Sequence, residues 1–184
     1  MRARLGLGRT FQRPDLFDRM RVRTNLAIGH EGGLAGRNPL RHLVGRRGDR
    51  ERVAQRAEAA LAECGLRDLA GRRASELSSG DRRLVELART LAGEFRILLL
   101  DEPSSGLDRA ERRRFATVLR QAVDRRGAGV LLVEHDMDLV LSVSDRIYVL
   151  DFGKVIFEGT PTEVRHSPVV RAAYLGSSRL EGVG

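Results

Sequence analysis

The stretch ILLLDEP, at residues 97–103, decides the fold. Ile97 to Leu100 form a continuous apolar run, and two carboxylates, Asp101 and Glu102, follow at once. Such a run predicts a parallel strand that is buried on both faces. Carboxylates at its end suit phosphoryl chemistry, because one can position Mg²⁺ while the next orients or deprotonates a water. Acidic residues are also common in turns, so the pair alone does not decide function.

The flanking sequence alternates between strand and helix patterns. Downstream, a helix is predicted after Asp108, which can cap it together with Glu111. A second buried strand is predicted at 129–133, followed by Glu134 and His135, and further strands near 146–150 and 155–157. Upstream, residues of about 22 to 93 have helical apolar spacing, which the Gly- and Arg-rich stretch 29–49 interrupts. The prediction is an α/β fold, with helices on the faces of a parallel sheet and a separate helical lobe.

Composition limits the classes of function. The chain has 184 residues, 41% hydrophobic and 32% charged, which predicts one main domain with room for a second small lobe. The net charge of +8 comes from scattered arginines, and aromatic residues are only 4%, so no stacking platform for nucleic acid is predicted. Cys64 is the single cysteine, which favours a reducing compartment. The apolar runs are too short to cross a bilayer, so any membrane link is expected through a partner.

Residues 77–81, LSSGD, precede an amphipathic helix. The Ser78 hydroxyl, the Gly80 backbone and the helix N-terminus are expected to face one small volume, which suits an anion. An ordinary capped helix would explain the same residues. The order of motifs separates the two interpretations: LSSGD, the Asp-Glu strand, SGLD at 105–108 and a strand ending at His135 rarely occur in this order by chance.

With these motifs the sequence resembles the ATP-binding cassette family over essentially its whole length. LSSGD is similar to the signature motif L-S-G-G-Q and departs from it at Ser79 and Asp81, while ILLLDEP resembles Walker B. The resemblance implies ATP and Mg²⁺ as cofactors. It assigns Mg²⁺ binding through water to Asp101, and the role of general base to Glu102.

The same resemblance assigns further residues. SGLD resembles the D-loop, and His135 the histidine that hydrogen-bonds the γ-phosphate. Gln12, in GRTFQ, matches the glutamine that senses Mg²⁺ and the attacking water and faces the membrane partner. Nucleotide contacts are implied for the signature and D-loop residues Ser78, Ser79, Gly80, Asp81 and Asp108. The implied fold is a partial P-loop NTPase-type sheet, with 1–21 as a core remnant, 22–93 as the helical subdomain and 94–184 as the other half of the core.

Within the family, GRTFQ, residues 134–161 and AYLG at 173–176 resemble subunits of branched-chain amino acid importers. This implies transmembrane permease subunits, a second ATPase subunit and, indirectly, a periplasmic binding protein as partners, at the cytoplasmic face of a bacterial plasma membrane. Nucleic acid is not expected. Importers for amides and urea, and the cassette of a lipopolysaccharide exporter, share much of this text, so the substrate stays open. A DNA- or ribosome-acting cassette is disfavoured, because such relatives usually carry tandem cassettes or a coiled-coil insertion.

A phosphate-binding loop of the form G-x-x-x-x-G-K-[ST] is missing from the 184 residues. Lys154 is the single lysine, and Tyr148 and Val155 stand where the first glycine and the hydroxyl residue of the loop would be. We therefore expect an N-terminally truncated chain that is inactive alone. The alternative is a non-catalytic remnant that docks a transmembrane partner.

Overall fold

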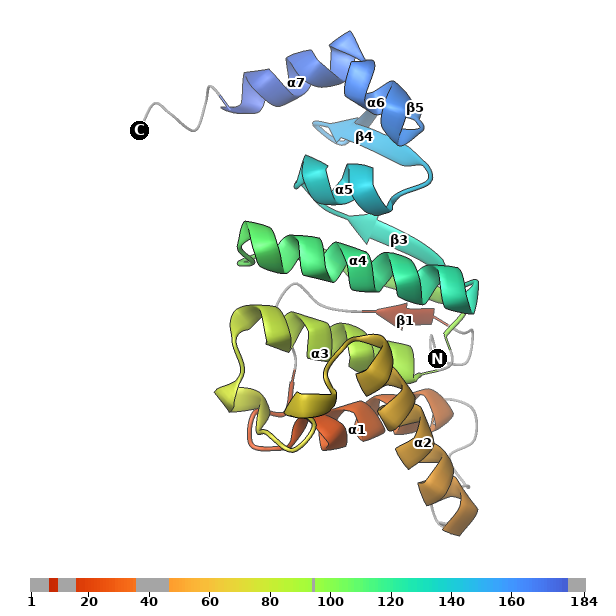
Figure 1. The fold of residues 1–184 in the computed structure, drawn as a ribbon. Coiled ribbons are helices and arrows are strands. Elements are labelled where there is room, and N and C mark those ends of the chain that lie inside the picture. The colour runs from red at the N-terminus through yellow and green to blue at the C-terminus, as the bar shows by residue number, and fades with distance from the viewer. Residues whose placement is uncertain (1–6, 10–15, 36–46, 94, 179–184) are drawn as a thin grey trace. The chain divides into compact units, whose positions relative to one another are not determined.

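The computed structural model describes residues 7–9, 16–35, 47–93 and 95–178 (Figure 1). The chain divides into two compact units, Met1–Glu134 and His135–Gly184. Gln12 lies outside the described residues. Among the described residues, no helix is both long and apolar enough to cross a membrane.

The sheet of the first unit is parallel, as predicted. Its strands are β1 (Leu7–Arg9), β2 (Ile97–Asp101) and β3 (Gly129–Val133), in the order β1-β2-β3. Leu7 is opposite Ile97, and Asp101 is opposite Val133, so the carboxyl ends of β2 and β3 coincide. Polar residues that follow these two strands therefore start from the same edge of the sheet.

The two faces of this sheet differ in burial, which corrects one prediction. Leu98 and Leu100 are buried. Ile97, Leu131 and Val133 belong to the opposite face by strand alternation and are 45%, 59% and 55% exposed. The continuous apolar run predicted burial on both faces, but in the described part of the chain that second face is open to solvent.

Three helices form the lobe between β1 and β2. They are α1 (Val22–Ala35), α2 (Arg47–Glu63) and α3 (Ser79–Ala92), and each packs against the other two. Short 3₁₀ turns at Arg67–Leu69 and Ala74–Glu76 connect α2 to α3. The apolar stripes read from the sequence form the lobe's core, with Leu26, Ala57, Leu61, Leu84 and Leu87 almost completely buried. This core fixes α3, and therefore the LSSGD motif at its start.

Helix α4 (Arg109–Arg126) connects β2 to β3. Asp108 caps it, and its side chain accepts hydrogen bonds from the N–H groups of Ala110 and Glu111. The helix ends at Gly127, whose φ of 60° lies in the left-handed region that favours glycine. The apolar side chains of its inner face, including Phe115 and Leu119, are buried.

The second unit consists of short elements around its own apolar cluster. In chain order they are α5 (Met137–Val143), β4 (Ile147–Asp151), β5 (Lys154–Gly159), α6 (Pro161–His166) and α7 (Pro168–Ser178). The cluster consists of Ile147, Val164 and Val170. Strands β4 and β5 are antiparallel, and Phe152 and Gly153 turn between them with φ of 43° and 77°. Lys154 thus begins a hairpin strand, which agrees with its exclusion as a phosphate-binding lysine.

Candidate functional site

The carboxyl end of β2 places two predicted site residues side by side. Asp101 is the last residue of the strand, and Glu102 follows with a φ of 43°. The left-handed region is unfavourable for a residue with a side chain and costs about 1–3 kcal/mol. The Glu102 N–H donates to the Val133 carbonyl at 2.8 Å, which ties this strained residue to the neighbouring strand. Both residues are half-buried.

Glu134 holds the loop after Glu102. Its Oε1 accepts a hydrogen bond from the N–H of buried Ser104 at 2.8 Å. Leu107 N–H donates to the Ser104 carbonyl at 3.0 Å, and Gly106 has a φ of 79°. The end of β3 therefore shapes the path from Glu102 to Asp108. The position of Glu134 at a strand end was the only signal of this contact in the sequence, and the sequence predicted no role for this residue.

The LSSGD motif forms the first turn of α3. The Ser78 hydroxyl caps the helix by accepting from the Asp81 N–H at 3.1 Å, and α3 begins at Ser79. The Gly80 N–H donates to Glu111 Oε1 at 3.1 Å. A Cβ atom at Gly80 would lie 2.4 Å from the same oxygen, so a larger residue here would displace the Glu111 carboxylate.

Glu111 links the signature-like motif to the D-loop-like motif. Its second oxygen, Oε2, accepts from the Asp108 N–H at 3.1 Å. One carboxylate therefore bridges Gly80 and Asp108, two predicted site residues that are distant in sequence. Asp81 is tied to α4 as well, because Arg114 Nη1 donates to its Oδ1 at 2.9 Å.

A buried ion pair adds a further link between α3 and the loop after β2. Arg83 and Glu86 are 5% and 2% exposed, and Arg83 Nη1 lies 3.2 Å from Glu86 Oε2. Arg83 Nη2 also donates to the Ser105 carbonyl at 3.4 Å. Sequence reasoning missed Arg83, Glu111 and Arg114 as links, because each contact depends on how α3 packs beside α4.

The predicted anion site therefore already contains an anion. The Ser78 hydroxyl caps its own helix, and the Gly80 N–H binds the Glu111 carboxylate. The N-terminus of α3 favours negative charge there, because its first N–H groups have no partner within the helix. In this structure the anion at the helix start is a side chain of the chain itself, and nucleotide binding by this motif stays a prediction.

Two further predicted site residues, His135 and Gln12, lie outside the described part of the first unit. His135 begins the second unit, and its carbonyl accepts a hydrogen bond from the Tyr174 hydroxyl at 3.4 Å. Gln12 lies outside the described residues. For these two residues, as for the other site residues, the assigned roles stay predictions.

A magnesium site made wholly of side chains is not found among the described residues, because no three His, Cys, Asp or Glu residues cluster there. Mg²⁺ commonly binds through one or two carboxylates together with substrate phosphates and waters. Asp101, half-buried at a strand end, fits that kind of site.

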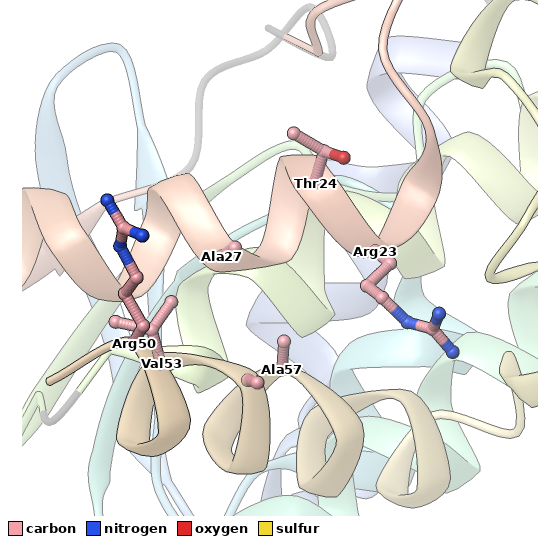
Figure 2. Close-up of a pocket in the computed structure, with 7 residues that line it drawn as sticks. Arg23, Thr24, Ala27, Arg50, Val53 and Ala57 are labelled. Atoms are coloured by element: carbon pink, nitrogen blue, oxygen red, sulfur yellow. The ribbon is translucent and has the colours of Figure 1, made fainter. Parts of the chain in front are cut away.

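A pocket of about 290 Å³ lies between α1 and α2 (Figure 2). Arg23 and Arg50 are at its two ends, and small apolar side chains, including Ala27, Val53 and Ala57, lie between them. Arg23 also pairs with Glu58 on α2, with 2.6 Å between Nε and Oε1. None of the predicted nucleotide-binding residues lines this pocket.

Comparison with known proteins gives consistent matches. Residues 2–105 match the family described as ABC transporter, and residues 154–179 match the family described as branched-chain amino acid ATP-binding cassette transporter. The chain is 39% identical, over 179 residues, to the high-affinity branched-chain amino acid transport ATP-binding protein LivG of Salmonella typhimurium. The alignment covers 96% of this chain and 70% of that relative. The aliphatic sulfonates import ATP-binding protein SsuB of Mycobacterium avium is also 39% identical, over 93% of this chain and 63% of its own length.

Solved structures show the same fold. The ADP conformation of MJ1267, an ATP-binding cassette of an ABC transporter, is similar with a TM-score of 0.74 and 30% identity, over 95% of this chain and 70% of that one. The structure of cbiO1 from Clostridium perfringens, part of the ABC transporter complex cbiONQ, has a TM-score of 0.73 and 28% identity, over 96% of this chain and 66% of that one. The predicted fold class is confirmed.

Proposed function

We propose that this chain, which belongs to the ATP-binding cassette transporter family and resembles its branched-chain amino acid type, serves in an ATP-hydrolysing subunit that energises import of branched-chain amino acids. One observation carries the proposal most directly. The signature-like turn at Ser78–Asp81 and the Asp101–Glu102 strand end occur in one compact unit, and the Asp108–Glu111 capping box joins the turn to the loop that leaves the strand. Motifs that follow one another in the sequence are therefore also joined by contacts in the fold.

The roles of the side chains follow from their positions. Glu102 accepts a proton from the attacking water, and its backbone, held by Val133, keeps the carboxylate at the strand end. Asp101 would hold Mg²⁺, and the ion, when bound, would neutralise charge on the phosphates. His135 and Gln12 align the γ-phosphate and the water.

The signature-like turn serves the nucleotide of a second ATPase subunit. Ser78, Ser79, Gly80 and Asp81 start α3, where N–H groups and the helix dipole favour a phosphate oxygen. Asp108 orients this turn through Glu111. Two subunits therefore close around nucleotide, and each completes the other's site.

The helical lobe binds the transmembrane partner. The pocket between α1 and α2 has an apolar floor, with Arg50 at one end and Arg23, which is paired with Glu58, at the other. This lining suits a helical segment with a small apolar residue and an acidic residue near Arg50. We propose permease subunits as that partner, a periplasmic binding protein as an indirect one, and the cytoplasmic face of a bacterial plasma membrane as the location. No nucleic-acid partner is proposed.

The first experiment tests catalysis. A chimera with a G-x-x-x-x-G-K-[ST] segment placed before Met1 should bind and hydrolyse ATP. In it, Glu102→Gln should retain ATP binding and lose about 10²- to 10⁴-fold in turnover, because glutamine cannot accept the proton of the water. Glu158→Gln, at an exposed carboxylate of the second unit, is the matched control and should hydrolyse normally. Near-normal turnover of Glu102→Gln would show that another residue is the general base.

The chain of 184 residues without that segment tests the alternative function, a remnant that docks a partner but does not bind nucleotide. Backbone amides and a lysine supply most affinity for triphosphates in this family of sites, and the sequence contains no such loop. Calorimetry is expected to detect no tight MgATP binding. Micromolar binding that disappears in Asp101→Ala would reject this expectation and would show that the chain has a phosphate-binding loop of another form.

The third experiment tests the substrate. The chimera, reconstituted in proteoliposomes with permease and binding protein, should drive uptake of radiolabelled leucine. Uptake of urea or a short amide without leucine would assign a related importer type instead.

A further inference from the structure

Tyr174 joins the C-terminal helix α7 to His135, the residue that begins the second unit. The Tyr174 hydroxyl donates to the His135 carbonyl at 3.4 Å, across 39 residues of sequence. Tyr174 lies in the span 154–179 that matches the branched-chain amino acid type of cassette, and the proposed function gives it no role. The contact therefore connects the segment that is typical of this type with a predicted catalytic residue.

The core of the second unit fixes the position of α7. Val170 is 5% exposed and belongs to the apolar cluster with Ile147 and Val164. The buried Ser167 accepts a hydrogen bond on its hydroxyl from the Val170 N–H at 3.4 Å, at the start of the helix. Tyr174 follows Val170 by four residues, so both side chains lie on the same face of α7. Tyr174 therefore extends from a helix face that the core holds in place.

The same core fixes the helix that follows His135. Asp136 caps α5, and its Oδ1 accepts from the Leu139 N–H at 2.8 Å. Leu139 is buried, and Met137 and Val140 pack against the apolar cluster. The His135 carbonyl belongs to the planar peptide group that joins His135 to this cap. A hydrogen bond from α7 to that carbonyl therefore restrains the peptide plane between two helices that are already held.

The orientation of this peptide plane limits where the His135 side chain can point. Rotation of the peptide group about the Cα–C bond is the ψ angle of His135, and the backbone angles determine which side-chain rotamers are allowed. His135 is exposed and Tyr174 is 50% exposed, so the contact lies at the surface of the unit. An imidazole with fewer rotamers loses less entropy when it aligns a phosphate oxygen.

We propose that Tyr174 is a positioning residue, which orients the His135 imidazole for its contact with the γ-phosphate. The inference rests on the proposed function, because the γ-phosphate role of His135 comes from there. Tyr174 acts through the backbone of His135 and is not placed on the nucleotide. A hydrogen bond that merely anchored α7 would leave the His135 rotamer unchanged, so the two roles predict different results.

Nuclear magnetic resonance of the 184-residue chain tests the positioning without nucleotide. Three-bond couplings across the χ1 angle of His135 report its rotamer populations, and one rotamer should dominate in the wild-type chain. Tyr174→Phe removes only the hydroxyl. The ratio of the dominant rotamer to the others should then fall about two- to fivefold, the range set by one hydrogen bond to an uncharged acceptor. Unchanged couplings in Tyr174→Phe, or averaged couplings already in the wild-type chain, would overturn the inference.

The chain supplies its own controls for this measurement. Tyr148 is the other tyrosine and is 53% exposed, so Tyr148→Phe is the matched variant and should leave the His135 couplings unchanged. His166 lies in α6 of the same unit, with its Nδ1 2.8 Å from the Thr162 carbonyl. The His166 couplings should be equal in all three chains, which shows that the unit is folded in each.

Turnover of the chimera with the G-x-x-x-x-G-K-[ST] segment gives a second readout. Tyr174→Phe should lower kcat about two- to fivefold and leave the KM for ATP unchanged, because the phosphate-binding loop supplies most of the affinity. In a His135→Ala background the same substitution should have no further effect, because the group that Tyr174 positions is gone. An equal loss of kcat in both backgrounds would overturn the inference. Full turnover of His135→Ala alone would reject the γ-phosphate role of His135, and the couplings would still decide whether Tyr174 orients the imidazole.

Discussion

Replacing Glu111 by alanine should destabilise the first unit by about 2–3 kcal/mol. The carboxylate accepts two hydrogen bonds, from Gly80 N–H and from Asp108 N–H, both at 3.1 Å. Bonds to a charged group contribute about 1.5–3 kcal/mol each, and the half-exposed position of Glu111 favours the lower end. Gly80 is buried, so its N–H would lose its partner away from bulk water.

Urea denaturation followed by far-ultraviolet circular dichroism measures this loss. Glu111→Gln keeps one acceptor oxygen and should lose about half as much stability, about 1–1.5 kcal/mol. Asp124→Ala on the same helix removes an exposed i,i+4 pair with Arg120 and should cost at most about 0.5 kcal/mol. A Glu111→Ala chain within about 0.5 kcal/mol of wild type, with an unchanged m-value, would refute the bridging role.

Three further predictions concern other buried or strained groups. Asn25→Ala should cost about 2–4 kcal/mol in unfolding free energy by urea titration, and Asn25→Asp more, because a carboxylate would face the carbonyls of Phe17 and Arg21. Glu102→Gly should have a free energy of unfolding in urea about 1 kcal/mol higher than Glu102→Ala, because glycine tolerates the φ of 43°. Equal stability of the two variants would contradict backbone strain at this position. Burial raises the pKa of the Cys64 thiol to about 12, with the Glu63 carboxylate adding to it, so the native thiol should resist a thiol reagent at pH 8. Because the pKa of the folded-state thiol is raised, its contribution to stability is present below about pH 9 and is lost as pH rises toward about 12. Cys64→Ala should remove this loss of stability at high pH, as measured by thermal melts at a series of pH values.

The fold was predictable where the local pattern and the tertiary environment agree. The apolar spacing of Leu84 and Leu87 matched the buried face of α3, and Asp108 with Glu111 formed the predicted capping box. The burial of β2 was predicted less well. A continuous apolar run does not indicate which face of the strand other elements cover, and Ile97 lies on the face that is exposed to solvent.

The candidate site was predictable as a list of motifs, but its connections were not. Gly80 was read as a donor to a phosphate, while the structure gives its N–H to Glu111, 31 residues away in sequence. Arg83, Arg114 and Glu134 were ordinary surface charges in the sequence. Their contacts depend on the packing of α3 beside α4 and on the end of β3, and neither leaves a periodic pattern.

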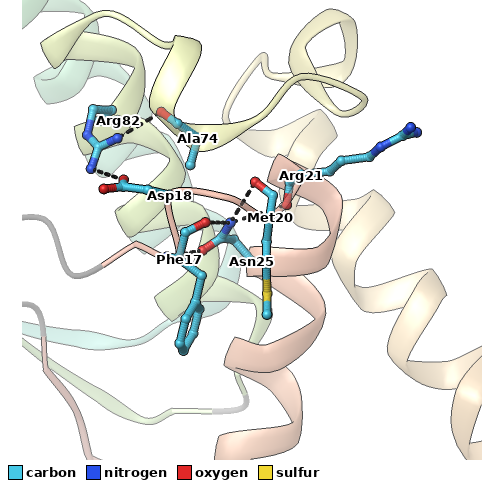
Figure 3. Close-up of polar contacts among 7 residues, drawn as sticks. All are labelled: Phe17, Asp18, Met20, Arg21, Asn25, Ala74 and Arg82. Carbon is cyan, nitrogen blue, oxygen red and sulfur yellow. Dashed lines mark hydrogen bonds and ion pairs between the residues drawn. The ribbon is translucent and has the colours of Figure 1, made fainter.

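The first turn of α3 is held from three sides by three consecutive residues. Gly80 binds Glu111, Asp81 binds Arg114, and Arg82 binds Asp18. Successive residues of an α-helix point about 100° apart, so three consecutive residues span about 200°, a little over half of the helix circumference. Two of these contacts lead to α4, and the third leads to Asp18 in the segment before α1 (Figure 3). A displacement of that segment therefore cannot move the start of α3 without changing its contacts with α4, and the Gly80 N–H can be given to a phosphate only if the Glu111 carboxylate moves away.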